Sequence, residues 1–416
     1  MKKIFYLSLI MLTSIILCGC IDESNASKKG VTFQFYDSGA FCTLKSIDLD
    51  ETYYINNKLK ATVVIPKTYN GKPVTAIKLD SFSKDFAFVE KIKFGKNISN
   101  ISLNNSSFPD LMEVSVSSNR NFISIDGALY TKDNKELLLW PNAKTFDNVV
   151  LPQGLENIYP LAFYCNNIKS LTIPSSIMYI QSFAFNNSLQ LEKVFFEDNS
   201  QLKIIHNYAF ADCKKLTEVT LPNNCNLDVI YDYAFRDCTK LNKINIPNSV
   251  TSINFCAFKD CRQLTSVTIN KESKLQKIDA LAFAGCEIDS IYLPYGLSYI
   301  GSCAFESCKE LKSIDIPDSV TWLGDAVFNK CSSLEYVKLP KYLENIPSCT
   351  FSKCTNLTTV VLPESLKGIS NSVFSECTNL KKIILLGTLE QWNNVSIQSD
   401  NDILTSGNIE ISESIN

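Results

Sequence analysis

The sequence predicts a solenoid of stacked coils, and three observations lead to that prediction. A short motif, A-F-x-x-C in its clearest copies, repeats so that its Phe returns ten times between Phe163 and Phe374, at intervals of 22 to 25 residues. A Pro precedes that Phe by eleven residues in seven copies. Apolar and polar residues alternate just before the Pro. A fixed period in the low twenties is typical of coils that stack on one another, not of a globule with one central core.

The copy from Leu311 to Cys331 shows the content of one coil. Residues 314–316 alternate apolar and polar, as a half-buried strand does, and Pro317 ends that strand because it cannot donate to a sheet. Two further apolar residues return to the interior from the opposite wall, and Gly324 permits a tight turn. The apolar cluster at 326–331 is expected to form a short helical turn.

A coil of this length cannot bury its own apolar face, so it buries that face against the coils before and after it. Strand then lies over strand in a parallel sheet with a spacing of about 4.8 Å. Equivalent residues form columns, Phe over Phe and Cys over Cys. We therefore predict a repeat α/β fold that is mostly β, with coils of about 23 residues and a cap at each end.

The N-terminal residues look like an export signal. Lys2 and Lys3 precede an apolar run that is too short for a comfortable membrane span. The run ends in Leu-Cys-Gly-Cys, which resembles a bacterial lipoprotein box. The resemblance implies a signal peptide over 1–19 and lipidation of Cys20. A plain secretory leader cut near Gly19 and an uncleaved anchor are the alternatives.

The rest of the chain divides into four parts. We expect a polar tether over 20–30, an N-terminal cap and first strand over 31–76, the solenoid over 77–397, and a disordered tail over 398–416. Two apolar runs around a Lys-Asp-Asn-Lys turn predict a hairpin insert near 123–141 that projects from the stack. Trp392 stands where a further coil would need Phe, so the last repeat is expected to cover the end of the core.

The coil L-x-x-I-x-I-P-x-x-V-x-x-I-x-x-x-A-F-x-x-C resembles the BspA-like leucine-rich repeat proteins of bacterial surfaces. The I-D-G-A-L-Y hairpin and the G-T-x-x-Q-W ending are similar to accessory segments of that family. The resemblance covers about 31–397. It implies a leucine-rich repeat solenoid, exposure at the cell surface or secretion, and attachment to host proteins, host cells or other bacteria. The family supplies no catalytic residues.

Composition sets further limits. The chain has 416 residues, of which 45% are hydrophobic, so it can bury an extensive core. Its formal net charge of −3 gives no basic surface for nucleic acid. No apolar run of membrane-spanning length follows the leader.

Cysteine usage is the strongest compositional signal. The chain has sixteen Cys, and eight of them share one repeat position, which is typical of packing residues. Disulfides between adjacent coils are the alternative, although stacked side chains point in parallel and reach the required dihedral with difficulty. Three coils also carry C-x4-C, a spacing compatible with zinc, but the extra Cys stands where other coils have apolar residues. We expect no metal and no cofactor.

The sequence offers little for catalysis. His206 is the only histidine, and its repeat position indicates a solvated loop residue. No nucleophile elbow, Walker or Rossmann pattern is present, so we expect no enzyme. Asp212, Asp237 and Asp260 share one repeat position, which favours a solvated edge over a calcium site because the following coils have Gly, Ser and Lys there.

The outward positions of the predicted strands are the informative surface. Most carry small or polar residues, whereas Phe195, Tyr292 and Tyr336 are aromatic, and Lys193 and Lys338 lie in the same strands as two of them. Exposed aromatic residues on a rigid face are typical binding anchors. The alternative is the ordinary preference of sheets for aromatic residues, without a ligand.

These observations favour a lipid-anchored, surface-exposed or secreted protein of the bacterial cell envelope. We expect a monomer that binds an extracellular or host-surface protein or glycan through its strand face, and that contacts the membrane through its lipid only. The first alternative is an envelope structural or assembly protein without a host ligand. A hydrolytic enzyme is the second, and the single His and the missing nucleophile pattern count against it.

Overall fold

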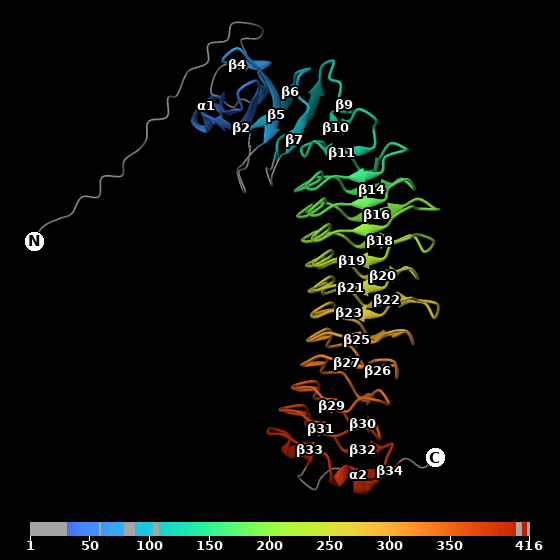
Figure 1. The fold of residues 1–416 in the computed structure, drawn as a ribbon. Helices are drawn as coiled ribbons and strands as arrows, with labels where there is room; N and C mark the ends of the chain where they lie inside the picture. The colour runs from blue at the N-terminus through green and yellow to red at the C-terminus, as the bar shows by residue number, and fades with distance from the viewer. Residues whose placement is uncertain (1–30, 58–59, 79–87, 103–107, 405–409, 414–416) are drawn as a thin grey trace, which may run out of the picture.

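The computed structural model describes residues 31–57, 60–78, 88–102, 108–404 and 410–413. The chain forms a long stack of coils, with the N-terminal coils leaning away from the axis of the others (Figure 1). This is the predicted solenoid of parallel sheets. The signal peptide, the tether and Cys20 lie outside the described residues.

One long side of the stack is the predicted parallel sheet, which we call the first sheet. Each coil adds one strand in register, so that Leu171 lies beside Val194 and Val194 beside Val219. These inward side chains are buried, and a Pro follows most strands as predicted. The sheet has two segments, formed by β12 (Val149–Val150), β14 (Ser170–Ile173), β16 (Lys193–Phe196), β18 (Glu218–Thr220), β20 (Lys243–Ile246), β22 (Ser266–Ile269) and β24 (Ser290–Ile291), then β26 (Ser313–Asp315), β28 (Tyr336–Lys338), β30 (Thr359–Leu362), β32 (Lys382–Leu385) and β34 (Glu410–Glu413).

A second parallel sheet forms where the sequence indicated only an opposite apolar wall. Each coil contributes a strand of two residues to this sheet. In the coils with a repeat Phe, the second residue of the strand lies five positions before that Phe, and its side chain is buried. The strands are β13 (Asn157–Ile158), β15 (Tyr179–Ile180), β17 (Ile204–Ile205), β19 (Val229–Ile230), β21 (Ser252–Ile253), β23 (Lys277–Ile278), β25 (Tyr299–Ile300) and β27 (Trp322–Leu323), then β29 (Asn345–Ile346), β31 (Gly368–Ile369) and β33 (Ser396–Ile397).

The third side of each coil is a chain of tight turns, so the expected helical turn at 326–331 was wrong. Two residues per coil, two before and two after the repeat Phe, adopt left-handed backbone, with φ between 55° and 65° where they are not Gly. Their amides donate to the next coil, as in the 2.9 Å bond from Asp237 N to Lys259 O. Other backbone amides of this segment donate to carbonyl oxygens within the same coil, as Arg236 N does to Tyr233 O. The backbone hydrogen-bonding groups therefore find partners without forming a helix.

The repeat Phe residues form the predicted column. All ten are buried, and neighbouring rings lie nearly parallel with centroids 4.7 to 5.7 Å apart. Trp140 begins the column by stacking on Phe163 at 5.2 Å. Each ring therefore fills the space between two coils, which is why the motif repeats so strictly.

The eight repeat Cys form a second column and do more than fill space. Each Sγ donates to the carbonyl oxygen of a Phe in the preceding coil, at 3.0 to 3.3 Å. Ser188 makes the same bond one coil earlier, at 2.8 Å to Phe163 O. The fourteen cysteines in the described part of the chain have free thiols.

The stacking begins earlier than the predicted boundary at residue 77. Inside the expected cap, β2 (Cys42–Leu49) already pairs in parallel with β5 (Lys72–Lys78), and β3 (Ala61–Val64) with β6 (Val89–Phe94). At the N-terminal end of the described chain, β1 (Val31–Asp37) pairs antiparallel with β2. The remaining elements here are α1 (Glu51–Asn57), β4 (Thr68–Tyr69), β7 (Asn100–Ser102) and β8 (Glu113–Val116).

The predicted hairpin is present, but it does not project. It is formed by β10 (Ala128–Thr131) and β11 (Glu136–Leu139), and β9 (Phe122–Ile125) pairs antiparallel with β10. Strand β11 also pairs in parallel with β13. Its strands are apolar on both faces because they lie between two cores. Tyr130 and Leu137 pack into the core of the main stack, whereas Leu129 and Leu138 pack into the core of the N-terminal coils.

The C-terminal end differs from the expected disordered tail at 398–416. Residues Asp402–Leu404 form a short 3-10 helix, and β34 pairs in parallel with β32. Trp392 lies in α2 (Leu389–Asn393) and packs against the core while partly buried. Asn401 Oδ1 accepts a hydrogen bond from the backbone amide of Phe374 at 3.1 Å. In the coil after the last repeat Phe, this side chain takes the place of a further stacked ring.

Candidate functional site

The outward side of the first sheet, here called the strand face, carries the five predicted binding residues. Lys193 lies in β16, and its Nζ is 3.8 Å from Glu218, which is also 3.8 Å from the Nζ of Lys243. The three side chains share one register row, so their charges alternate along it. Pairs as exposed as these add little stability, because water screens them.

Phe195 and Tyr292 share the other outward row, but they are far apart along it. Phe195 is half-buried between Thr172 and Thr220 of the adjacent strands. Tyr292 directly follows β24 and is 36% exposed. Three coils without an aromatic residue in this row separate them, a gap of nearly 20 Å between strands at about 4.8 Å spacing.

Tyr336 and Lys338 lie together in β28, two coils beyond Tyr292. Tyr336 is 37% exposed, and burial together with the charge of Asp315 raises its pKa. Lys338 lies between Asp315 and Val361 in register. The structure thus places all five residues on one face, at separate points of it. Within the described residues, the three aromatic side chains make no ring contacts with one another.

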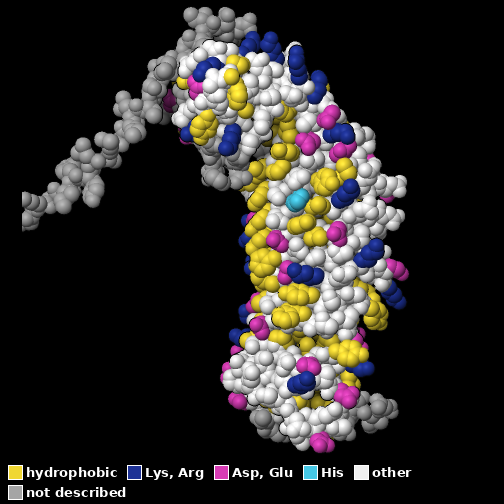
Figure 2. Space-filling view, viewed as in Figure 1, with side chains coloured by type: hydrophobic (Ala, Val, Ile, Leu, Met, Phe, Trp, Pro, Cys, Tyr) yellow, Lys and Arg dark blue, Asp and Glu magenta, His cyan; other side chains and the backbone are white. Residues whose placement is uncertain are grey.

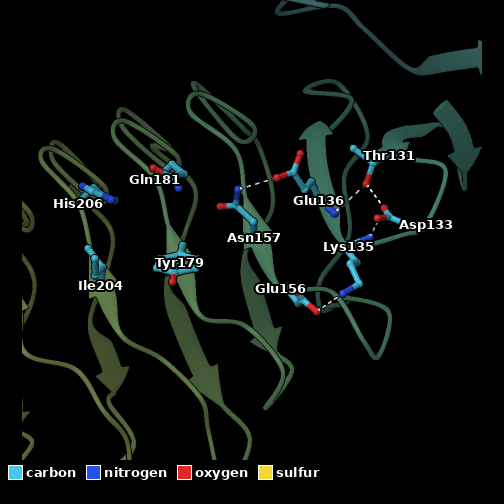
Figure 3. Close-up of a pocket in the computed structure, with 10 residues that line it drawn as sticks. All are labelled: Thr131, Asp133, Lys135, Glu136, Glu156, Asn157, Tyr179, Gln181, Ile204 and His206. Carbon is cyan, nitrogen blue, oxygen red and sulfur yellow. Dashed lines mark hydrogen bonds and ion pairs between the residues drawn. The ribbon is translucent and has the colours of Figure 1, made fainter. Parts of the chain in front are cut away.

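A hollow on the second sheet is a feature that sequence reasoning missed. Figure 2 shows this side of the molecule, where hydrophobic side chains gather along the stack. The hollow has a volume of about 440 Å³ and lies where the hairpin turn meets the second sheet (Figure 3). It is lined by Thr131, Asp133, Lys135, Glu136, Glu156, Asn157, Tyr179, Gln181, Ile204 and His206.

The hairpin forms one wall of the hollow. Asp133 accepts from Thr131 Oγ1 at 2.7 Å, and this bond, with the Lys135 amide, lowers the pKa of Asp133. Lys135 Nζ lies 2.7 Å from Glu156 on the neighbouring coil. Asn157 Nδ2 donates to Glu136 at 3.3 Å. These contacts hold the hairpin turn against the first coils of the sheet.

The floor of the hollow is formed by side chains that point outward from the second sheet. One side of the hollow is formed by Gln181 and His206, which directly follow strands β15 and β17. Tyr179 lies between Asn157 and Ile204 in register, and Lys203 Nζ is 6.0 Å from the centroid of its ring. His206 was expected to be a solvated loop residue, but it is half-buried with its ring 5.3 Å from that of Tyr231. Burial lowers the pKa of His206, which keeps it neutral at pH 7.

A weak sequence signal for this surface exists. An Ile or a Leu stands five positions before every repeat Phe and forms a pair with the residue before it, as in Tyr299-Ile300 and Trp322-Leu323. A pair is too short to show alternation, so the pattern does not identify strands by itself. The sequence does not show that the hairpin turn lines one hollow together with residues as distant as His206.

The Asp residues that share one repeat position have a backbone explanation. Asp212, Asp237 and Asp260 occupy the left-handed position after the repeat Phe, where Asp, Asn and Gly are favoured. Asp237 pairs with Arg236 at 2.8 Å and Asp260 with Arg262 at 3.5 Å. Across the described part of the chain, no group of three or more His, Cys, Asp or Glu side chains could hold a metal ion.

Comparison with known families decides what kind of chain this is. The family model for the BspA type leucine rich repeat region matches residues 141–265, 228–298 and 276–403. The chain belongs to the BspA-type leucine-rich repeat family. Leucine-rich repeat folds are typically non-catalytic and typically serve protein–protein interaction. No curated protein sequence matches this BspA-type chain.

A solved structure agrees on the fold. The chain is similar to a leucine-rich repeat protein from Bacteroides ovatus, with 19% identity and a TM-score of 0.53, over 89% of this chain and 98% of that one. It is also similar to a leucine rich cell surface protein from Faecalibacterium prausnitzii, with 20% identity and a TM-score of 0.45, over 91% of this chain and 98% of that one. Among the described residues, no helix is long and apolar enough to cross a membrane.

Proposed function

We propose that this BspA-type protein is a lipid-anchored protein of the bacterial cell surface that binds an extracellular protein or glycan through its strand face. The observation that carries this proposal is the strand face itself. Its strands are locked in register by the Phe and Cys columns, so the side chains on it are held in place before a partner arrives. A preformed surface loses little conformational entropy on binding, and weak contacts can therefore add up.

The aromatic residues of this face are the expected anchors. Phe195 presents apolar surface in the same strand as Lys193, and Tyr336 in the same strand as Lys338, whereas Tyr292 stands between these two pairs. This combination suits a partner with both apolar and acidic groups. Their wide separation supports an extended partner that follows the stack over several coils, such as a fibrous protein or a long glycan.

The test is binding of the immobilised protein to host extracellular matrix proteins and to whole cells. Changing Phe195, Tyr292 and Tyr336 together to Ser should reduce binding at least tenfold. The matched control changes Leu189, Tyr295 and Tyr342 to Ser, because these are exposed apolar residues outside the strand face. Unchanged binding of the first variant would reject this face. Absence of any ligand would favour the envelope structural alternative.

The anchor is tested separately. The Cys20→Ser variant should appear in the soluble fraction of cells, whereas the unmodified sequence should sediment with membranes. A Cys42→Ser variant is the control, because Cys42 is buried in the fold and is not in the lipoprotein box. Continued membrane association of Cys20→Ser would reject lipidation at that residue.

A further inference from the structure

The hollow between the hairpin and the second sheet is a second candidate site, independent of the strand face. It lies on another side of the coils, and its lining includes none of the strand-face residues. Its volume of about 440 Å³ exceeds that of a single amino-acid side chain and suits a small ligand of one or two rings.

The wall and the floor offer different chemistry. The wall is polar and fixed, because Asp133, Lys135 and Glu136 are each held by hydrogen bonds or an ion pair. The floor presents the Tyr179 ring next to Ile204, which gives an apolar patch at the base of a polar site. Ligand sites typically combine such an apolar patch with a few convergent polar groups.

Several polar groups around the hollow have unused hydrogen-bonding capacity. The Gln181 amide and the His206 imidazole make no side-chain hydrogen bond within the described residues, and Asn157 Oδ1 is shielded from solvent without a partner. Glu136 accepts one bond, from Asn157. Gln181 and neutral His206 can each donate and accept, whereas Glu136 only accepts.

This set of groups selects among ligand classes. Three carboxylates line the hollow, those of Asp133, Glu136 and Glu156. They outnumber the ammonium groups of Lys135 and of Lys203, whose Nζ lies 6.0 Å from the Tyr179 ring, so an anionic ligand is disfavoured. An aliphatic ligand would leave the unused amide and imidazole without partners, which costs free energy. A ligand with hydroxyl groups at its rim and an apolar C–H face satisfies both the polar wall and the Tyr179 ring.

We propose that this hollow binds a neutral saccharide. One of its sugar rings packs on Tyr179, and hydroxyl groups along the length of the saccharide bond to Glu136, Gln181 and His206. The hairpin turn closes one end of the hollow, and the other end opens along the second sheet. A chain terminus or a short branch of a glycan therefore fits better than the middle of a long polymer.

The test is calorimetric titration of the full chain, held in a detergent without sugar, with maltotriose, lactose, mannotriose and chitotriose. At least one should bind, and Tyr179→Ser and Gln181→Ala should each raise its Kd at least tenfold. The Gln181 side chain makes no hydrogen bond among the residues that the structure describes, so its change should leave the melting temperature intact. Tyr299→Ser is the matched control, because Tyr299 occupies the same row in β25, five coils away.

Three results would overturn the proposal. They are the absence of binding by all four sugars at 10 mM, binding that neither substitution weakens, and a tetralysine peptide that binds in place of the sugars. The triple Ser variant of the strand face should bind the sugar as tightly as the unmodified protein. Loss of saccharide binding and loss of adhesion are therefore distinguishable.

Discussion

The repeat Cys shows how one side chain serves two needs of a stacked coil. It fills a small buried space, and its S–H donates to a Phe carbonyl of the preceding coil. The two coils before Cys213 carry Asn166 and Ser188 at the same position, and both are buried. Ser188 donates to Phe163 O, and Asn166 Nδ2 donates to Asn142 Oδ1 at 3.4 Å. The position therefore requires a small donor, and the thiol satisfies that requirement while remaining apolar.

This view predicts different effects for two substitutions at Cys261. Cys261→Ala removes the donor and leaves a small void, so the free energy of unfolding should fall by about 1–2 kcal/mol. Cys261→Ser should cost less than Cys261→Ala, because Ser188 makes the equivalent bond in its own coil. Urea titration of both variants measures the difference. A Ser variant less stable than the Ala variant would show that the hydrogen bond is unimportant.

Burial of the thiols also predicts a loss of stability in alkali. Burial raises the pKa of Cys308 and of Cys377 to about 12, from an ordinary value of 9.0. Below pH 9 the thiols are protonated in both states and the stability is fully present. Above pH 9 only the unfolded chain ionises, so the free energy of unfolding falls as pH rises toward 12.

The size of this effect is measurable between pH 9 and 11. Each buried thiol contributes a slope of up to about 1.4 kcal/mol per pH unit. The Cys308→Ser variant should show a decline shallower by one such contribution in urea titrations at pH 9, 10 and 11. Equal slopes for the variant and the unmodified protein would contradict a buried, neutral Cys308.

At the scale of the element, the sequence predicted strands where several residues alternate and failed where they do not. The first sheet was predictable because residues 314–316 and their equivalents alternate before a Pro. The second sheet was not, because its strands are two residues long and are defined by bonds to neighbouring coils. The hairpin turn was visible, but its place between two cores depends on residues distant in sequence.

The structure gives Gly324 a different role from the one that the sequence predicted. It was expected to permit a tight turn, yet its importance lies in the space that it leaves. A Cβ at this position would lie 2.3 Å from Ser302 N, and one at Gly301 would lie 2.4 Å from Ala280 N. Both distances are too short for any carbon atom, so the two glycines allow adjacent backbones to approach closely.

Gly324→Ala should therefore destabilise the coil even though Ala restricts the unfolded chain. The clash is with backbone, which cannot rotate away, and overpacking of this kind costs about 1–3 kcal/mol. Gly296→Ala is the control, because its Cβ would meet only Leu275 O at 3.7 Å. The control should change the free energy of unfolding by less than about 0.5 kcal/mol. Equal midpoints in urea for both variants would contradict the close approach.

For the whole molecule, stacking makes stability a sum over neighbouring coils, so position along the stack should matter. Phe258 lies in the middle of the column, with ring centroids 5.2 and 5.3 Å away on its two sides. Phe374 is the last repeat Phe, and within the described segments its one ring neighbour is Phe351 at 5.7 Å. Both side chains are almost fully buried, so burial alone predicts equal losses for the two.

Phe258→Ala should lower the free energy of unfolding by about 3–5 kcal/mol, and Phe374→Ala by clearly less. The reason is that removing Phe258 opens a cavity between two complete coils, whereas the end of the stack can close over a smaller gap. Amide hydrogen exchange adds a second measurement. The Phe258 variant should lose protection in the coils on both sides, and the Phe374 variant only near the C-terminal end. Similar losses in both variants would mean that the stack behaves as one cooperative core, without the dependence on neighbours that a solenoid requires.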